Sequence, residues 1–284
     1  MTIYVTGGRG RLGSELVRLG CTPIECDITN LYQVKDALAD TTPDDILIHT
    51  AAYTDVDGSQ GDEQIGAAFR INVRGTAQVR DFHQGRMILI STDYIFSGKN
   101  GPYRERSIPK DSVNDYGLTK LAAEAIISMP MRKGDTIVRT TGLYGGPSGK
   151  PDFLNLVIHY LSAGKVLDVI KTLYGNQTYI PHLAEALIDL AMLDNPPSIL
   201  NLGSREVISR YEFSLMIASV FGLDKSLLNP VSKVEGWIAP RPTKGGLRVD
   251  LARKLGLPIY SILDGLKSHR DLLFERSNGN EERN

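Results

Sequence analysis

Short apolar runs alternate along the chain with longer segments in which apolar residues recur every three or four positions. The short runs predict strands at about residues 2–6, 23–26, 45–50, 86–91 and 135–139. The longer segments predict helices at about 11–19, 30–39, 60–82, 114–128, 151–163, 181–194, 209–222 and 260–274. Because strands alternate with helices, we expect a doubly wound α/β Rossmann fold, in which a parallel sheet is covered on both faces.

A glycine-rich loop joins the first predicted strand to the first predicted helix. Its glycines, Gly7, Gly10 and Gly13, are spaced three residues apart. In such a loop the first glycine permits a tight turn, the second lets the backbone approach a pyrophosphate, and the third allows close helix packing. The free N–H groups at the helix start favour phosphate charge. This segment therefore predicts a dinucleotide site.

A tyrosine and a lysine lie four residues apart in the predicted helix 114–128. Tyr116 and Lys120 therefore project from one face, and the ammonium can lower the pKa of the phenol from its ordinary value of ~10. The pair alone is common on helices. Together with the glycine loop and with Ser91-Thr92-Asp93-Tyr94 at a strand end, it indicates hydride transfer on a nicotinamide cofactor.

Four short segments directly follow predicted strands. They are the glycine loop, Ala51-Ala52-Tyr53, Ser91-Thr92-Asp93 and Thr140-Thr141-Gly142. The carboxyl ends of parallel strands share one edge of a sheet, so we expect a ligand crevice there.

Glycine and proline cluster beyond residue 146, and the predicted strands become shorter. We expect residues 1–146, with a return at about 171–195, to form the dinucleotide-binding domain. Residues 147–170 and 196–276 would then form a smaller C-terminal substrate-binding lobe. The polar residues 277–284 predict a disordered tail.

Composition narrows the classes of function. The 284 residues include 32 basic and 33 acidic side chains, interspersed, so nothing indicates a nucleic-acid partner. No apolar run approaches the ~18 residues of a membrane span, and the start does not resemble a signal peptide; we expect a cytoplasmic protein with no membrane partner. Cys21 and Cys26 predict free thiols, and the five histidines are too scattered to predict a metal site.

Seven motifs together resemble the extended short-chain dehydrogenase/reductase family. They are TGGRGRLG at 6–13, AAYTDVD at 51–57, NVRGT at 72–76, STDYIFSG at 91–98, YGLTK at 116–120, VRTTGLYG at 138–145 and APRPTKGGL at 239–247. Within that family the chain is most similar, over about residues 1–274, to the dTDP-4-dehydrorhamnose reductases. The resemblance implies NAD(P)H-dependent reduction of the 4-keto group of a nucleotide-linked deoxysugar.

The resemblance also implies roles for individual residues. Tyr116 would donate a proton to the sugar O4, Lys120 would hold the nicotinamide ribose, and Thr92 would hydrogen-bond the keto oxygen. The implied cofactor-binding residues are Gly7, Arg9, Gly10, Arg11, Leu12, Gly13, Asp27, Ile28, Ala51, Ala52, Tyr53, Asn72, Ser91, Tyr116 and Lys120. The implied substrate-binding residues are Val56, Thr92, Asp93, Tyr94, Gly142 and Arg241, the last resembling a diphosphate-binding arginine. Asn72 has two open roles, a structural one and a proton relay.

Arginines in the glycine loop bear on the choice of cofactor. Arg9 and Arg11 can each clamp a 2′-phosphate with paired hydrogen bonds, so we expect NADPH to be preferred over NADH. The chain departs from the rhamnose-pathway pattern at Gly142, where Trp is usual, and at Val56-Asp57-Gly58-Ser59-Gln60, where VDxAE is usual. These departures leave the base and the sugar of the substrate open.

Related activities remain as alternatives. Related dehydratases carry Asp-Glu after the strand-end threonine, whereas Tyr94 follows Asp93 here, so dehydration is disfavoured. A related nucleotide-sugar epimerase/reductase would be expected to show a Cys and a His that are not obvious here. A non-catalytic subunit similar to the regulatory beta subunit of methionine adenosyltransferase is the alternative from another class of protein. A homodimer is the default expectation.

Overall fold

The structure is a computed structural model that describes residues 1–61, 65–146 and 151–281, with the backbone alone from residue 276 on. Its centre is a six-stranded sheet in the order β2-β1-β3-β4-β5-β8, and every pairing in this sheet is parallel. The strands are β1 (Ile3–Thr6), β2 (Thr22–Ile24), β3 (Ile46–His49), β4 (Arg86–Thr92), β5 (Thr136–Thr140) and β8 (Ile199–Asn201). The strand order reverses between β1 and β3, which confirms a doubly wound sheet with a crevice at that point.

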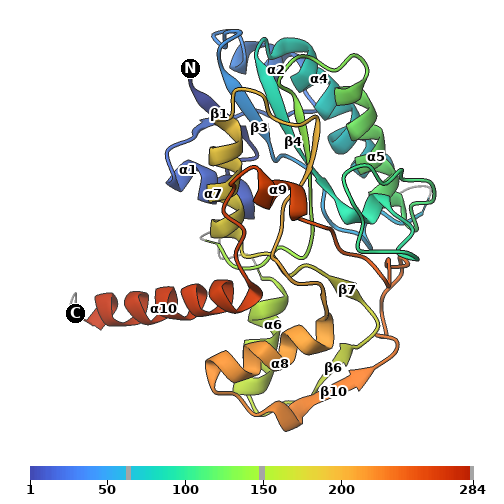
Figure 1. The fold of residues 1–284 in the computed structure, drawn as a ribbon, viewed down its shortest axis with the longest axis vertical. Coiled ribbons are helices and arrows are strands. Elements are labelled where there is room, and N and C mark those ends of the chain that lie inside the picture. The colour runs from blue at the N-terminus through green and yellow to red at the C-terminus, as the bar shows by residue number, and fades with distance from the viewer. Residues whose placement is uncertain (62–64, 147–150, 282–284) are drawn as a thin grey trace.

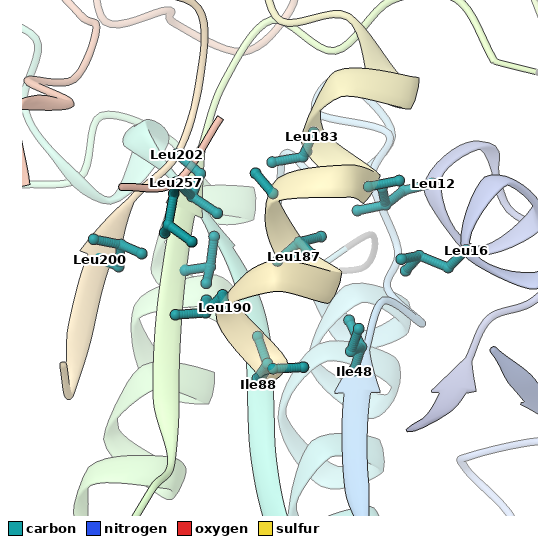
Figure 2. Close-up of a cluster of buried hydrophobic side chains, with 14 of the residues drawn as sticks. Leu12, Leu16, Ile48, Ile88, Leu183, Leu187, Leu190, Leu200, Leu202 and Leu257 are labelled. Atoms are coloured by element: carbon teal, nitrogen blue, oxygen red, sulfur yellow. The ribbon is translucent and has the colours of Figure 1, made fainter. Parts of the chain in front are cut away.

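Helices cover both faces of this sheet (Figure 1). One face carries α1 (Arg11–Arg18), α7 (Ile180–Ala191) and α9 (Asp250–Lys254), and the other carries α2 (Leu31–Ala37), α4 (Thr76–Phe82) and α5 (Asp115–Ser128). Figure 2 shows where α1 and α7 meet the sheet, through Leu12, Leu16, Leu183, Leu187, Leu190, Ile48 and Ile88. Burial of each such side chain contributes about 1.5–3 kcal/mol, which fixes the strand ends relative to the helices.

The predicted helix 60–82 has an irregular centre. It contains α3 (Ile65–Phe69), a π-helical segment η1 (Arg70–Gly75) and α4, while residues 62–64 lie outside the described part of the chain. Inserted π turns occur often at functional sites. A Cβ at Gly75 would stand 2.7 Å from Cδ1 of Ile28, so the glycine lets this helix approach the loop after β2.

A second lobe lies beside the sheet domain, at the bottom of Figure 1. Its elements are α6 (Phe153–Ser162), β6 (Leu167–Ile170), β7 (Tyr174–Gly175), β9 (Ile208–Ser209), α8 (Arg210–Phe221), η3 (Lys225–Leu227) and β10 (Leu228–Val231). The lobe has a core of its own, formed by side chains such as Leu154, Phe213 and Ile217. Helix α10 (Ile262–Glu281) packs on this core through Leu266 and extends away from the body of the molecule.

The structure corrects two of the predicted boundaries. Strand β8 and helix α9 fall within the predicted lobe segment 196–276, yet β8 pairs with β5, and Ala252 of α9 packs in the sheet core. Three residues after a proline pair carry too little pattern to identify a strand, and the still shorter β7 and β9 were missed for the same reason. Helix α10 continues through residue 281, into the predicted tail; residues 282–284 lie outside the described residues, as do 147–150 of the predicted lobe.

Both cysteines are free, as predicted, and Cys21 is buried beside α1. Among the described residues, no helix is long and apolar enough to cross a membrane.

Candidate active site

A cavity of about 470 Å³ opens at the carboxyl ends of the sheet strands. All four predicted strand-end segments contribute to its lining, as the sequence indicated. Of the predicted site residues, the cavity is lined by Gly10, Arg11, Leu12, Gly13, Ala52, Val56, Ser91, Thr92, Asp93, Tyr94, Tyr116, Lys120 and Gly142. The volume lies within the range of about 300–1,000 Å³ that is usual for small-molecule sites.

The glycine loop has the geometry that its spacing predicted. Gly7 adopts a φ of 70° and accepts a hydrogen bond from the backbone N–H of Gly10 at 2.8 Å. A Cβ at Gly13 would stand only 2.1 Å from the carbonyl oxygen of Gly7, so only glycine allows α1 to begin here. Gly10 is the N-cap residue of α1 and has no side chain to accept hydrogen bonds. The first backbone N–H groups of the helix are therefore left facing the cavity.

The start of α5 packs directly on the end of β4. A Cβ at Gly117 would stand 2.1 Å from the carbonyl oxygen of Tyr94, so the glycine after Tyr116 permits this approach. The side chain of Asn114 caps α5 by accepting a hydrogen bond from the Gly117 N–H at 2.8 Å. These contacts hold Tyr116 beside Thr92, although the two residues are far apart in sequence.

The phenol of Tyr116 lies in the cavity and forms a hydrogen bond with the Thr92 hydroxyl. Burial raises the pKa of Tyr116 above its ordinary value, and the nearby Tyr94 and Asp93 raise it further, whereas the Thr92 hydrogen bond and Arg11 lower it. The sequence-based expectation that Lys120 lowers this pKa is therefore wrong for the structure, because removal of water from the phenol outweighs the attraction of nearby cations. Tyr116 consequently keeps its proton at neutral pH.

Lys120 is 3% exposed and lies one turn after Tyr116 on the same helix. Burial lowers the pKa of its ammonium to about 8, and the Glu124 carboxylate, one further turn along α5, opposes this shift. His49 is also buried, and its pKa is lowered to about 3 by burial and by the charge of Lys120. The imidazole is therefore neutral, and it is held by the hydroxyls of Thr6 at 2.7 Å and Thr76 at 3.1 Å.

A buried ion pair supports α5 behind the cavity. The guanidinium of Arg139 donates to both carboxylate oxygens of Glu124, at 3.0 and 2.7 Å, and the Ser91 hydroxyl donates to the same carboxylate at 2.6 Å. The side chain of Ser91 is thus engaged by the protein. Removal of one partner of such a buried pair is expensive, so this network fixes the position of α5 relative to β4 and β5.

Asn72, in the π segment, is fully buried and does not line the cavity. Its side chain accepts from the N–H of Tyr53 at 2.8 Å and donates to the Tyr53 carbonyl at 3.1 Å and to the Thr119 hydroxyl at 2.9 Å. Of the two roles left open by the sequence, these contacts describe the structural one: Asn72 ties the loop after β3 to α5.

Several other predicted cofactor residues lie outside the cavity lining. The side chain of Arg9 is 86% exposed and pairs with Glu25 at 2.7 Å, directly after β2. Asp27 is exposed, and its carboxylate accepts from Thr29, while Ile28 is buried in the core on the α2 side of the sheet. Gly7, Ala51 and Tyr53 shape the loops behind the lining residues.

Arg241 does not line the cavity, and its guanidinium is occupied. It donates to both carboxylate oxygens of Asp57, at 3.0 and 2.6 Å, and to the carbonyl of Ala239 at 2.6 Å. The Asp57 carboxylate also accepts the backbone N–H groups of Ile238 and Ala239, and these contacts lower its pKa to about 2, with the Arg241 hydrogen bonds as the largest cause. The pair joins the loop after β3 to the segment that follows β10.

Gly142 has a φ of 61°, and a Cβ there would stand 2.3 Å from the carbonyl oxygen of Asn176. A tryptophan side chain does not fit this backbone. Aromatic residues reach the cavity from the second lobe instead, as Phe153 and Tyr174, and Arg210 and Gln177 lie there too. These four residues were not predicted from the sequence. The Arg-Tyr-Glu-Phe run at 210–213, which begins a helix behind a Ser-Glu capping pair, was the only local signal for one of them.

A sequence profile described as the RmlD substrate binding domain matches residues 1–268. The chain belongs to this family. A dTDP-4-dehydrorhamnose reductase of Mycobacterium tuberculosis (strain H37Rv) is 32% identical over 84% of the chain and 81% of its own length. The spore coat polysaccharide biosynthesis protein SpsK of Bacillus subtilis (strain 168) is also 32% identical, over 84% of the chain and 86% of its own length.

A solved structure supports this family assignment. The dTDP-4-dehydrorhamnose reductase of Bacillus anthracis (strain Ames), crystallised in complex with NADP, superposes with a TM-score of 0.85 at 28% identity and covers 95% of this chain and 99% of its own. The resemblance to extended short-chain dehydrogenase/reductases is confirmed. These matches do not favour the regulatory-subunit alternative.

Proposed function

We propose that the protein is an NAD(P)H-dependent oxidoreductase that reduces the 4-keto group of a nucleotide-linked deoxysugar, as the names of its relatives indicate for those proteins. The observation that carries this proposal is the pairing of the Tyr116 and Thr92 hydroxyls in one cavity with the buried ammonium of Lys120. A proton donor, a hydroxyl for the oxygen and a fixed cation are what carbonyl reduction requires of a protein.

The residues of the cavity fit a dinucleotide. The uncapped start of α1 and the close approach of Gly13 to Gly7 leave space and N–H groups for a pyrophosphate, and Lys120 can hold a ribose hydroxyl. The dinucleotide supplies the hydride when bound. Tyr116, protonated at neutral pH, gives its proton to the keto oxygen, and the Thr92 hydroxyl hydrogen-bonds the same oxygen as negative charge develops there.

We propose further that NADPH is preferred over NADH. Arg9 lies at the rim of the glycine loop, where its exposed guanidinium can exchange Glu25 for a 2′-phosphate. Glu25 opposes this preference. A carboxylate directly after the second strand can accept a hydrogen bond from a ribose 2′-hydroxyl, and it repels a 2′-phosphate. The balance between these two side chains sets the cofactor ratio in this proposal.

Turnover with dTDP-4-dehydrorhamnose tests the proposed function. Purified protein is mixed with this sugar and NADPH, loss of NADPH is followed by absorbance, and the product is identified by NMR. We expect turnover in the wild type that is strongly reduced in Tyr116→Phe while NADP⁺ binding persists. UDP- and GDP-linked 4-keto sugars are run in parallel, and absence of turnover with every sugar would contradict the proposal. Light scattering on the same sample tests the expected homodimer.

A further inference from the structure

Arg210 is a positive charge that forms no ion pair among the described residues. It is the first residue of α8, and it lines the cavity together with Tyr94 and Tyr174. None of the ion pairs in residues 1–61, 65–146 and 151–275 includes it, and its guanidinium makes no side-chain hydrogen bond there. Its guanidinium carbon lies over the ring of Phe153, 4.5 Å from the ring centroid.

The acidic side chains around Arg210 are each engaged by backbone N–H groups. Asp152 accepts from Gly145 at 2.6 Å and from Asn155 at 3.0 Å. Asp93 accepts from Gly246 at 3.0 Å, and Glu212 accepts from the N–H of Ser209 at 2.7 Å in the capping box of α8. These carboxylates therefore stabilise turns and helix starts, and none of them pairs with Arg210.

The backbone fixes Arg210 in this position. Its N–H donates to the carbonyl of Leu173 at 3.0 Å, next to the antiparallel pairing of β7 with β9. Burial lowers the pKa of its guanidinium and Arg241 lowers it further, whereas Tyr94, Asp152 and Asp93 oppose the shift. A cation that is partly removed from water and left unpaired destabilises a fold, so its presence in a ligand cavity indicates an anion as its partner.

Arg241, by contrast, is neutralised by Asp57. Its two terminal nitrogens are used by one carboxylate and one carbonyl oxygen, and the guanidinium also covers the ring of Trp237, 4.7 Å from the centroid. A diphosphate that reached Arg241 would have to displace a two-point ion pair, whereas one that reached Arg210 would displace only solvent. Of the arginines that line the cavity among the described residues, Arg11 donates to the Leu143 carbonyl at 3.3 Å, whereas Arg210 makes no side-chain hydrogen bond.

We infer that Arg210 receives the diphosphate of the nucleotide sugar, and that Arg241 instead holds the loop around Asp57 in place. This inference rests on the proposed function for the class of substrate. A guanidinium matches two phosphate oxygens at once, and Phe153 contacts this one through its ring face. The cavity then binds the sugar between Tyr116 on the sheet side and Arg210 on the lobe side.

Binding without turnover tests the inference separately from the reaction. Calorimetry in the presence of NADP⁺ measures the affinities of dTDP, UDP and GDP and of the corresponding nucleosides. The nucleoside diphosphate that binds most tightly is then used with the variants. In the wild type we expect the diphosphate to bind at least about tenfold more tightly than its nucleoside, since a charge-assisted pair contributes about 1.5–3 kcal/mol. Equal affinities for all three pairs would overturn the inference with no variant needed.

Two matched variants then separate the arginines. Arg210→Gln should reduce diphosphate affinity roughly ten- to a hundredfold and leave the affinities for the nucleoside and NADP⁺ unchanged, while Arg210→Lys should retain part of it. Arg241→Gln should have the smaller effect on the diphosphate. The opposite ranking would overturn the inference. If Arg210 governs diphosphate binding but no 4-keto sugar turns over, the proposed reaction fails and the binding assignment stands.

Discussion

The two sides of the cavity differ in how their polar side chains are used. On the sheet side, Lys120, Glu124 and Asn72 are buried, and Glu124 and Asn72 are joined to neighbouring elements by hydrogen bonds. On the lobe side, Arg210 is only partly buried, and no carboxylate of the described residues pairs with it. The sheet side is thus assembled before any ligand arrives, whereas the lobe side holds a charge that a ligand completes.

This difference predicts a division of labour between the two sides. Groups held rigidly around a reacting atom lower the barrier of the chemical step, while groups that contact a remote part of the substrate act on the ground state and the transition state alike. Changes on the sheet side should therefore reduce kcat, and changes on the lobe side should raise KM. Five experiments test the two sides of the cavity, from the largest expected effect to the smallest.

Tyr116→Phe should produce the largest loss. The phenol supplies the proton, so its removal should lower kcat by roughly 10²–10⁴ while the affinity for cofactor stays near that of wild type. Steady-state kinetics and a separate cofactor titration measure the two quantities. Leu118→Ala, an exposed position two residues along the same helix, is the matched control and should leave both unchanged. Wild-type turnover in Tyr116→Phe would exclude the proposed proton donor.

The charge of Lys120 should give a pH dependence. Its pKa of about 8 means that the ammonium loses its proton above that pH, so kcat/KM for the cofactor should fall on the alkaline side of pH 8. Tyr116 keeps its proton there, because its pKa is raised, and does not cause the decline. In Lys120→Met the overall rate should drop and this alkaline decline should vanish; a decline that persists would assign it to another group.

The same lysine predicts how stability depends on pH. The unfolded chain holds the proton up to the ordinary pKa of 10.5, whereas the folded chain releases it near 8. The unfolded state therefore binds more protons between these values, and the free energy of unfolding contributed by this group should rise with pH across that window. Denaturant titrations at several pH values should show the rise in the wild type and a smaller one in Lys120→Met.

Gly142 lies where the two sides meet, and its substitution measures how tightly they are joined. Gly142→Ala combines a left-handed backbone with a clash against Asn176, whereas Gly164→Ala has a φ of 65° and open space around the new Cβ. Gly164→Ala should lower the free energy of unfolding by about 1–2 kcal/mol. Gly142→Ala should cost about 1–3 kcal/mol more, measured by denaturant unfolding. Equal losses would mean that the lobe loop moves aside easily.

The rim of the glycine loop should give the smallest effect. Arg9→Ala should reduce the preference for NADPH over NADH, measured as a ratio of kcat/KM values, by about tenfold, and Glu25→Gln should increase it. Because both side chains are exposed, neither change should alter stability measurably. A wild type that favours NADH, or a ratio unchanged in both variants, would contradict the proposed role of this pair.

The difference between the two sides also explains what the sequence could predict. Gly7, Gly10 and Gly13, and the pair Tyr116 and Lys120, act within single turns or helices, so their spacing carries the information. The doubly wound sheet followed from the alternation of apolar runs for the same reason.

Residues of the lobe side, by contrast, are placed by tertiary pairing. Arg210 reaches the cavity through the pairing of β7 with β9, and each of these strands has only two residues. Asp57 and Arg241 form an ion pair although they lie 184 positions apart in the sequence, and no local pattern reveals such a contact. The pKa of Tyr116 was misjudged because burial depends on the complete fold.

The position of β8 has a consequence for the order in which the protein acquires its structure. Its partner β5 ends at Thr140, yet Ile199 leaves the ribosome only after α6, β6, β7 and α7 have been synthesised. The edge strand β8 can therefore join the sheet only after half of the second lobe, still without α8, has emerged with its apolar side chains uncovered. Contacts of such long range slow folding, and the exposed lobe segment is where a chaperone would bind the nascent chain.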